Sequence, residues 1–465
     1  MNQNEMFRFL SVGLPEDIAR RKAWGDLEGA IRLIDRELRR QDLPEALRNC
    51  MTVEREIMCR IPEDYPLTRA DALAEIRQHI PDFTEKEFDE RVDAGKIGWV
   101  YLNGEMHFFN RFFSSMCKAE PAFAQRAGVM MHGVESVTRE EGEGRLDRVA
   151  RLMRQNGSMT NRIRIRASVR VKDECFLPGM FVRAHLPIPA ACEQQSDIRI
   201  EKIFPETGRV APEDAAQRTV CWEETMTENH PFVVEYSYLH TATYHDLSDV
   251  RADSVQPTFD TEEIAPHVVF TPFIHSLVDK LTKGTDNPLE KARRFYDFIT
   301  LQMRYNFMPS YFILEDIAQS CARSYTGDCG VFALLFLTLC RCAGIPAQWQ
   351  SGLTAEPDFI GGHDWVRFYI APYGWLFADP SYGTAAVRAQ NEERRRFYFG
   401  NLDAYRMVAN REFQAPFTVP KQYWRMDPYD NQLGEIETDK RGLRSYEFER
   451  SKEILLCEEQ EEAIG

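Results

Sequence analysis

Residues 327–346 read GDCGVFALLFLTLCRCAGIP, and this stretch decides the fold prediction. Its centre is apolar almost all round, which is typical of a helix buried in the middle of a domain. Gly327 gives the helix a tight start, and Gly344 with Pro346 gives it a clean end. The pattern therefore predicts a central helix with Cys329 at its N-terminus. Free N–H groups and the helix dipole favour a thiolate there, so we expect a lowered pKa for the Cys329 thiol. A buried structural thiol is the alternative interpretation.

Two predicted strands follow this helix. Residues 361–370 alternate in polarity, with His363 near the start of the run. Residues 373–378 form a second run, and Asp379 follows it directly. A turn at 371–374 joins them. Antiparallel neighbours of this kind bring His363 and Asp379 side by side. A helix-terminal cysteine that faces such a pair has the arrangement of a nucleophile, its base and the group that orients the base.

At this point the chain resembles the transglutaminase-like superfamily. The region of resemblance is about residues 285–385, and the order Cys, His, Asp is also that of the family. Four motifs carry the resemblance: Gly327-Asp328-Cys329, Gly344-Ile345-Pro346, His363-Asp364-Trp365, and Gly374-Trp375 with Asp379-Pro380.

The resemblance implies an α+β, papain-like core in which the cysteine helix packs on an antiparallel sheet. It implies Cys329 as nucleophile, His363 as base and Asp379 as the orienting residue. The oxyanion hole would combine the Cys329 backbone N–H with an upstream donor, either Gln302 or Tyr305. We expect Trp365 and Trp375 to serve core packing and the wall of the cleft. No cofactor is implied, and the sequence shows no metal site: the calcium sites of the animal enzymes have no recognisable counterpart here.

The rest of the chain divides by pattern. Residues 1–150 are predicted to be mainly helical, with a hairpin near 99–108 because Asn103-Gly104 accepts positive φ. Period-two runs predict an antiparallel, sandwich-like β-domain over 158–250. The catalytic domain is expected over 260–395. Residues 396–465 are too aromatic for a tail, so we expect an extension packed on the catalytic domain.

Composition narrows the function classes. Of 465 residues, 73 are acidic and 57 basic, a net charge of −16, which argues against a nucleic-acid binder. Two helices followed by a hairpin keep DNA binding by residues 67–108 open as a hypothesis. The longest apolar run is far shorter than the roughly 20 residues of a membrane span. No export signal is visible at the N-terminus and none of the 11 cysteines forms a CxxC pair, so we expect a cytoplasmic protein with reduced thiols.

The sequence thus predicts a cysteine peptidase, amidase or transglutaminase-like enzyme that forms an acyl-enzyme on Cys329. Hydrolysis is favoured over transamidation because transamidation needs a cleft that excludes water, and the sequence shows none. A peptide or protein is the expected substrate. The alternative is a catalytically inactive transglutaminase-like fold that acts as a binding or scaffold protein, since most of the chain lies outside the matched region.

Overall fold

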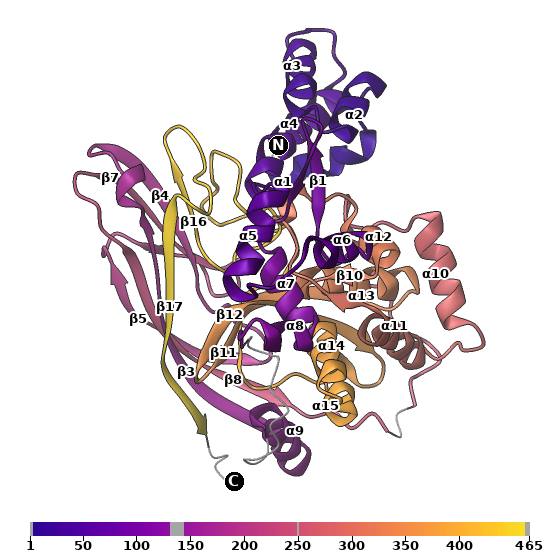
Figure 1. Ribbon diagram of the computed structural model, residues 1–465. Coiled ribbons are helices and arrows are strands. Elements are labelled where there is room, and N and C mark those ends of the chain that lie inside the picture. The colour runs from indigo at the N-terminus through magenta and orange to yellow at the C-terminus, as the bar shows by residue number, and fades with distance from the viewer. Residues whose placement is uncertain (1–2, 131–143, 249–250, 461–465) are drawn as a thin grey trace.

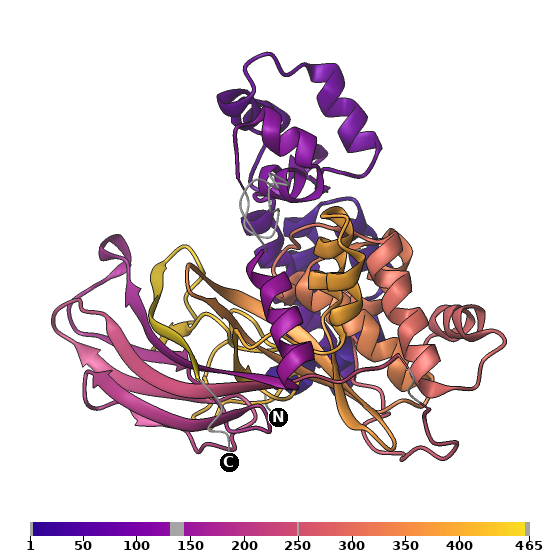
Figure 2. The same ribbon diagram turned by 90° about the horizontal axis from the view of Figure 1, so that it is seen from below.

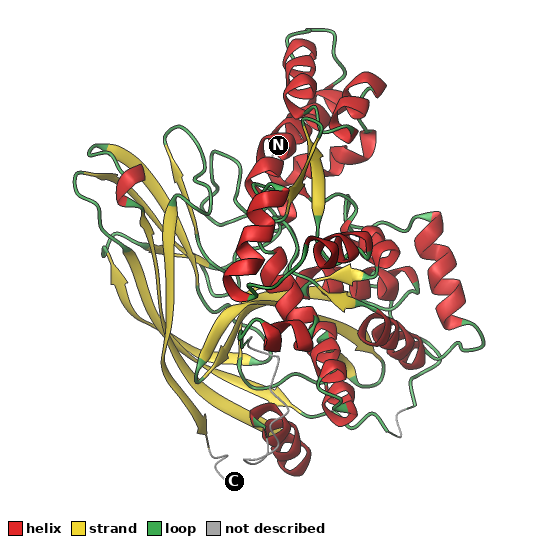
Figure 3. Cartoon of the chain, viewed as in Figure 1, coloured by secondary structure: helices red, strands yellow, loops and turns green. Residues whose placement is uncertain are grey.

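The computed structural model describes residues 3–130, 144–248 and 251–460. Figure 1 shows a helical N-terminal region, a β-sandwich on one side and a mixed part with helices and a sheet on the other. Figure 3 shows the same division as strands gathered on one side and helices on the other. The α+β fold class predicted from the sequence is confirmed.

The N-terminal region contains two helical groups with separate apolar cores. The first group holds α2 (Glu16–Ala23), α3 (Leu27–Glu37) and α4 (Glu45–Asp64). Before it come α1 (Gln3–Met6) and the 3-10 helix η1 (Phe7–Val12), whose Phe7 is buried in the core of the mixed part. The second holds α5 (Arg69–His79), α6 (Glu85–Asp93), β1 (Trp99–Leu102), β2 (Glu105–Phe108), α7 (Phe112–Ala119) and α8 (Pro121–Arg126). Asn103 and Gly104 have φ values of 52° and 87°, which allow the tight turn between β1 and β2.

Two four-stranded sheets form the sandwich, and the helix α9 (Arg145–Asn156) leads into it. One sheet has the order β17-β3-β8-β5 and the other β16-β4-β7-β6. Their strands are β3 (Ser158–Val171), β4 (Met180–Pro187), β5 (Gln195–Phe204), β6 (Arg209–Val210), β7 (Thr219–Met226), β8 (Phe232–Thr243), β16 (Glu435–Thr438) and β17 (Phe448–Gln460). Alternate residues of β3 are buried between the sheets, as the period-two pattern predicts.

The mixed part packs helices on a five-stranded sheet with the order β14-β13-β12-β11-β15. Its helices are α10 (Pro272–Thr282), α11 (Pro288–Gln302), α12 (Ile317–Ser324), α13 (Cys329–Cys342), α14 (Pro380–Arg388) and α15 (Glu392–Phe397). Its strands are β11 (Ala347–Glu356), β12 (Phe359–Ile370), β13 (Gly374–Ala378), β14 (Phe399–Gly400) and β15 (Arg406–Asn410). Helix α13 is buried along nearly its whole length, because apolar side chains surround it on every face.

The C-terminal segment is shared between the two folds. We expected residues 396–465 to pack on the predicted catalytic domain, and β14 and β15 do form the two edges of the five-stranded sheet. In contrast, β16 pairs with β4, and β17 pairs with β3, so these strands complete the sandwich. Figure 2 shows the sandwich beside the mixed part, with α9 between them. Strand partners this far apart in sequence leave no local signal in the segment itself.

Within the described ranges, no helix combines the length and the apolar composition that crossing a bilayer requires.

Candidate active site

Cys329 is the first residue of α13, at the place the sequence predicts. Asp328 caps the helix: its side chain accepts a hydrogen bond from the backbone N–H of Val331 at 3.3 Å and another from the Tyr311 hydroxyl. Just before it, β10 (Thr326–Gly327) pairs in parallel with β9 (Arg304–Tyr305). A side chain at Gly330 would meet the Tyr311 ring, so the backbone approaches this tyrosine closely. These contacts fix the Cys329 sulfur at the N-terminus of α13.

His363 and Asp379 are brought together by neighbouring strands. His363 lies in β12, and Asp379 follows β13 and caps α14 by accepting a hydrogen bond from the Tyr382 N–H at 2.9 Å. His363 Nε2 lies 2.8 Å from Asp379 Oδ2. The two residues are 6% and 0% exposed. Because Nε2 donates to the carboxylate, Nδ1 is left as the proton acceptor of the ring.

The Asp379 carboxylate is itself held by an arginine from the last strand of the sheet. Arg406 Nη1 lies 2.9 Å from Asp379 Oδ2, and Arg406 Nη2 lies 2.6 Å from Asp403 Oδ2. Burial raises the pKa of Asp379, but His363 and Arg406 outweigh burial and bring it below its ordinary value. Burial lowers the pKa of His363 against the opposing effect of Asp379. The site therefore holds an ionised Asp379 beside a neutral imidazole at neutral pH.

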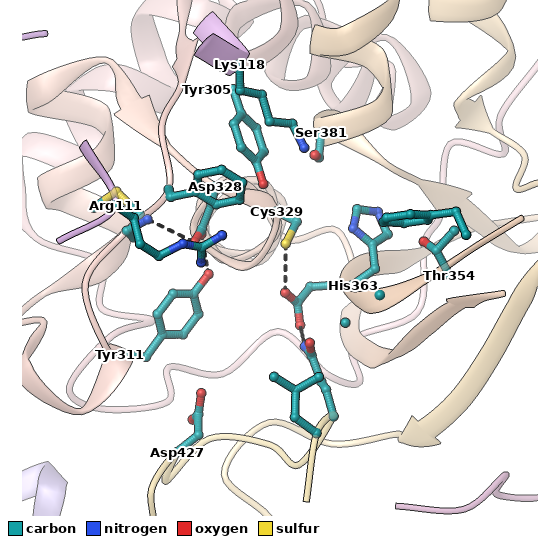
Figure 4. A pocket seen from close by; sticks show the side chains of 18 of the residues that line it. Arg111, Lys118, Tyr305, Tyr311, Asp328, Cys329, Thr354, His363, Ser381 and Asp427 are labelled. Atoms are coloured by element: carbon teal, nitrogen blue, oxygen red, sulfur yellow. Dashed lines mark hydrogen bonds between the residues drawn. The ribbon is translucent and has the colours of Figure 1, made fainter. Parts of the chain in front are cut away.

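The sulfur of Cys329 has a partner that the sequence analysis did not anticipate. Cys329 Sγ donates a hydrogen bond to Asp364 Oδ2 at 3.2 Å. Figure 4 shows this bond, with the Cys329 sulfur and the His363 ring facing the same pocket. Among the described residues, the thiol makes no hydrogen bond to the imidazole. The structure thus brings His363 and Asp379 into direct contact and leaves Cys329 beside them, bound to Asp364.

The pKa of the Cys329 thiol differs from the expectation. Burial raises it well above its ordinary value, and the carboxylates of Asp364 and Asp328 add to the effect, while Lys118 opposes it. The helix N-terminus predicts the opposite direction. Desolvation and two nearby acids outweigh the helix dipole here, because each disfavours the thiolate directly. In this arrangement the cysteine rests as a neutral thiol.

Two further acidic residues, Asp427 and Asp430, belong to the surroundings of Asp364. Gln432 Nε2 bridges Asp364 and Asp430, with 2.8 Å to Asp430 Oδ2. Burial and the neighbouring Asp430 raise the pKa of Asp364 well above its ordinary value. Burial and Asp430 also raise the pKa of Asp427 to about 8. Burial raises the pKa of Asp430 as well, so the three carboxyls of this acidic cluster, Asp364, Asp427 and Asp430, hold their protons to higher pH than ordinary aspartates do.

Cys329, His363 and the acidic cluster open onto one cavity of about 1150 Å³. Its walls come from helix α7, from the mixed part and from the loop before β16. Residues that line it include Lys118, Tyr305, Tyr311, Cys329, Glu356, His363, Asp364, Arg388, Asp427, Asp430 and Gln432. The described residues contain no group of three or more His, Cys, Asp or Glu side chains arranged to hold a metal ion.

The remaining predicted site residues separate. Tyr305 is buried and lines the cavity, whereas Gln302 is exposed at the end of α11 and lies outside it. Trp365 is fully buried and donates to Gln350 Oε1 at 2.8 Å, so it serves core packing. Trp375 packs on Phe259 and Tyr369 away from the cavity. Neither tryptophan forms the cleft wall, because their strand positions direct them to other surfaces.

Sequence reasoning missed Asp364, Lys118 and Arg388. Alternation along a strand directs Asp364 to the face opposite His363, so its contact with Cys329 had no signal. Lys118 lies more than 200 residues before the cysteine in the chain. Arg388 ends α14 in a stretch that shows only ordinary helical polarity. Lys118 and Arg388 belong to no local motif, and the motif that contains Asp364 gives no role for its side chain.

The region that carries this site is similar to known proteins. Residues 275–380 match the profile of the Transglutaminase-like superfamily. The uncharacterized protein YebA of Bacillus subtilis (strain 168) is 26% identical over 154 residues, 29% of this chain and 21% of that protein. The chain thus spans about a fifth of the length of the curated relative that it matches.

Two solved structures are similar at low identity. A protein of Cytophaga hutchinsonii described as a candidate cysteine protease is 14% identical with a TM-score of 0.38, covering 64% of this chain and 91% of that one. The periplasmic domain of TgpA from Pseudomonas aeruginosa is 14% identical with a TM-score of 0.28, covering 54% and 96%. The profile match of residues 275–380 to the Transglutaminase-like superfamily spans the elements that carry Cys329, His363 and Asp379.

Proposed function

We propose that this chain is a thiol enzyme that opens an amide or peptide bond through an acyl-enzyme on Cys329. The observation that carries the proposal is the buried 2.8 Å contact of His363 with Asp379, in the cavity that also receives Cys329. A neutral imidazole held by an ionised aspartate is suited to accept the thiol proton. The match of residues 275–380 to the superfamily supports the same chemistry.

The reaction begins when the Cys329 side chain rotates from Asp364 toward His363. Nδ1 of His363 takes the thiol proton, and the sulfur attacks the amide carbonyl carbon. The oxyanion that forms accepts hydrogen bonds from the Cys329 backbone N–H and from the Tyr305 hydroxyl, which burial keeps protonated by raising the pKa of Tyr305. His363 then gives its proton to the leaving nitrogen, the C–N bond breaks, and a thioester remains on Cys329.

Water completes the cycle in the form of the proposal that we favour. His363 accepts a proton from water, the hydroxyl adds to the thioester, and the thiolate leaves with a carboxylic acid as product. A cavity of about 1150 Å³ that is lined by several carboxylates admits water to the acyl-enzyme. An amine in place of this water gives transamidation by the same residues.

The test is product analysis with a glutamine-containing model peptide, with and without a primary amine, followed by mass spectrometry. Ammonia or peptide release without amine incorporation is the expected result. Cys329→Ala should abolish release, whereas Cys342→Ala, at the far end of the same helix, should leave it intact. Amine incorporation at the expense of hydrolysis would establish the transamidation form instead.

A second candidate rests on the resting geometry of the thiol. Cys329 bonds to Asp364 and has a raised pKa, and both features fit a fold that binds partners without catalysis. Labelling of Cys329 by a mild thiol-directed activity probe separates the two. Efficient labelling that disappears in His363→Ala supports the enzyme, and equal, slow labelling in both proteins supports the binding protein.

A further inference from the structure

Two cationic side chains from distant parts of the chain meet at one wall of the cavity. Lys118 comes from helix α7 of the N-terminal region, and Arg388 ends helix α14. Both flank the ring of Tyr305: Lys118 Nζ lies 4.5 Å from the ring centroid and Arg388 Cζ lies 5.8 Å from it. Figure 4 shows Lys118 and Tyr305 pointing into the pocket near Cys329. We call Lys118 and Arg388 the cationic pair.

Neither member of the cationic pair has an anionic partner among the residues that the structure describes. All three guanidinium nitrogens of Arg388 are buried and make no hydrogen bond. Lys118 makes no ion pair or hydrogen bond there either, and its contacts are with the rings of Tyr305 and Phe307. By contrast, Arg145 in the same cavity is paired with Glu356 and Asp358. A buried guanidinium without acceptors is rare because it loses its hydration without compensation.

The two charges also act on each other. The pKa of Lys118 is lowered to about 8, chiefly by burial; the neighbouring Arg388 and Arg111 add to this effect, and Cys329 opposes it. Burial lowers the pKa of Arg388 as well. Two unpaired cations held together inside a cavity repel each other, and an anion bound between them removes both the repulsion and the lost hydrogen bonds.

The opposite wall has the opposite character. The acidic cluster of Asp364, Asp427 and Asp430 lines the cavity on the other side of Cys329, with Gln432 and Asp430 behind Asp364. A carboxyl group offers an anionic ligand no positive charge and repels it once ionised. The charge distribution of the cavity therefore directs an anion to the cationic pair.

We propose that Lys118 and Arg388 form a subsite that binds a carboxylate of the acyl donor, so that the substrates are acidic peptides. This proposal rests on the proposed function and names its substrate class. The carboxylate belongs either to an acidic side chain or to a free C-terminus, since both present the same two oxygens to a guanidinium. Because Lys118 lies in α7, the N-terminal region supplies part of the specificity. The position of α7 is held by Ser115 of the same helix, whose Oγ accepts a hydrogen bond from the Phe307 N–H at 3.1 Å.

The first test compares two alkylating reagents that differ only in charge. The rate of Cys329 alkylation by iodoacetate is divided by that of iodoacetamide, in the full chain and with the site located by mass spectrometry. Both reagents consume the same thiolate, so the ratio cancels any change in the thiol pKa. We expect Lys118→Gln and Arg388→Gln each to lower the ratio by about tenfold, the scale of a hydrogen bond to a charged group.

The control for long-range charge is Arg396→Gln, an exposed residue on α15 outside this cavity. Its ratio should equal that of the wild type, and Lys118→Arg should retain most of it. If the cationic pair instead stabilises the thiolate alone, both rates fall together and the ratio stays constant in every variant. That result overturns the subsite and leaves the proposed function standing.

The second test does not depend on the reactivity of the thiol. Calorimetry on Cys329→Ala measures binding of the blocked peptides acetyl-Ala-Glu-amide and acetyl-Ala-Gln-amide, and of acetyl-Ala-Ala with a free C-terminus. Preferential binding of the glutamate peptide assigns the subsite to acidic side chains. Preferential binding of the free acid assigns it to a C-terminus. In either case Arg388→Gln should remove the preference.

The subsite proposal is wrong if the neutral peptide, acetyl-Ala-Gln-amide, binds as tightly as the two acidic peptides. It is also wrong if none of the three peptides binds. The proposed function fails separately, when Cys329 shows no product release and no His363-dependent labelling although the acidic peptide still binds.

Discussion

At the scale of single residues, burial and then the neighbouring Asp364 raise the pKa of the Cys329 thiol and so limit how readily the thiolate forms. Asp364 releases its proton late because burial and Asp430 raise its pKa, and its negative charge then raises the pKa of the adjacent thiol. Removal of the carboxylate should let the thiolate appear at lower pH.

We therefore expect Asp364→Asn to shift the pH profile of Cys329 alkylation by iodoacetamide to lower pH, with a severalfold higher rate at pH 8. The control is Asp358→Asn, an exposed carboxylate at the rim of the same cavity. An unchanged profile in Asp364→Asn would mean that burial alone sets the pKa of the thiol.

Arg406 is the residue on which the charge balance beneath the imidazole depends. It is fully buried between Asp379 and Asp403, so its loss leaves two buried carboxylates without a cation. We expect Arg406→Met to lower the free energy of unfolding by about 3–5 kcal/mol, measured by urea denaturation. Arg396→Met, on the surface, should change it by less than about 0.5 kcal/mol. Similar stability in both variants would contradict the role given to Arg406.

At the scale of elements, the loop before β16 brings Asp427 and Asp430 close to Asp364 of β12. This packing makes the free energy of unfolding depend on pH. The folded state raises the pKa of Asp364 and Asp430, and that of Asp427 to about 8, whereas an unfolded aspartate titrates near about 3.9. Between these limits the folded chain holds protons that the unfolded chain has lost, so stability is present at low pH and falls as pH rises through the folded pKa values.

The midpoint of thermal unfolding should consequently decrease from pH 5 to pH 8. Asp427→Asn should flatten this decrease because one titrating group is gone. Asp358→Asn should leave the slope as it is, since that carboxylate is exposed. A midpoint that rises over this interval would contradict the protonation assigned to the cluster.

The elements also show what sequence can and cannot predict. Cys329, His363 and Asp379 each lie at the end or start of an element whose pattern is local, so the helix, the two strands and the contact of His363 with Asp379 could be predicted. Lys118 and Arg388, which line one wall of the cavity, could not be predicted from the sequence, because they meet only through tertiary packing. The pKa of Cys329 differed for the same reason: the helix dipole is visible in the sequence, and the desolvation of the thiol is not.

At the scale of the whole molecule, the sandwich and the five-stranded sheet pack against each other. Leu353 and Ala355 of β11 and Met407 and Ala409 of β15 are buried in the core of the sandwich. Strand β17 covers the outer edge of β3 along almost its full length. An unprotected edge of this length, with its apolar face exposed, promotes aggregation.

Truncation after residue 446 should therefore leave a chain that does not fold, seen as loss of the cooperative thermal transition and recovery in aggregates. Truncation after residue 460 retains β17 and should unfold at the same temperature as the full chain. A cooperative transition in the shorter chain would show that the sandwich is stable without its last strand.

The three walls of the cavity have a further consequence for the order in which they are made. A ribosome produces Lys118 first, Cys329 much later, and Asp427, Asp430 and Gln432 later still. Until those last residues emerge, the nascent chain carries its thiol without the side chains that line the acidic wall and support Asp364. The proposed active site is therefore assembled only after the acidic wall has been translated, so the thiol is made before the side chains of that wall.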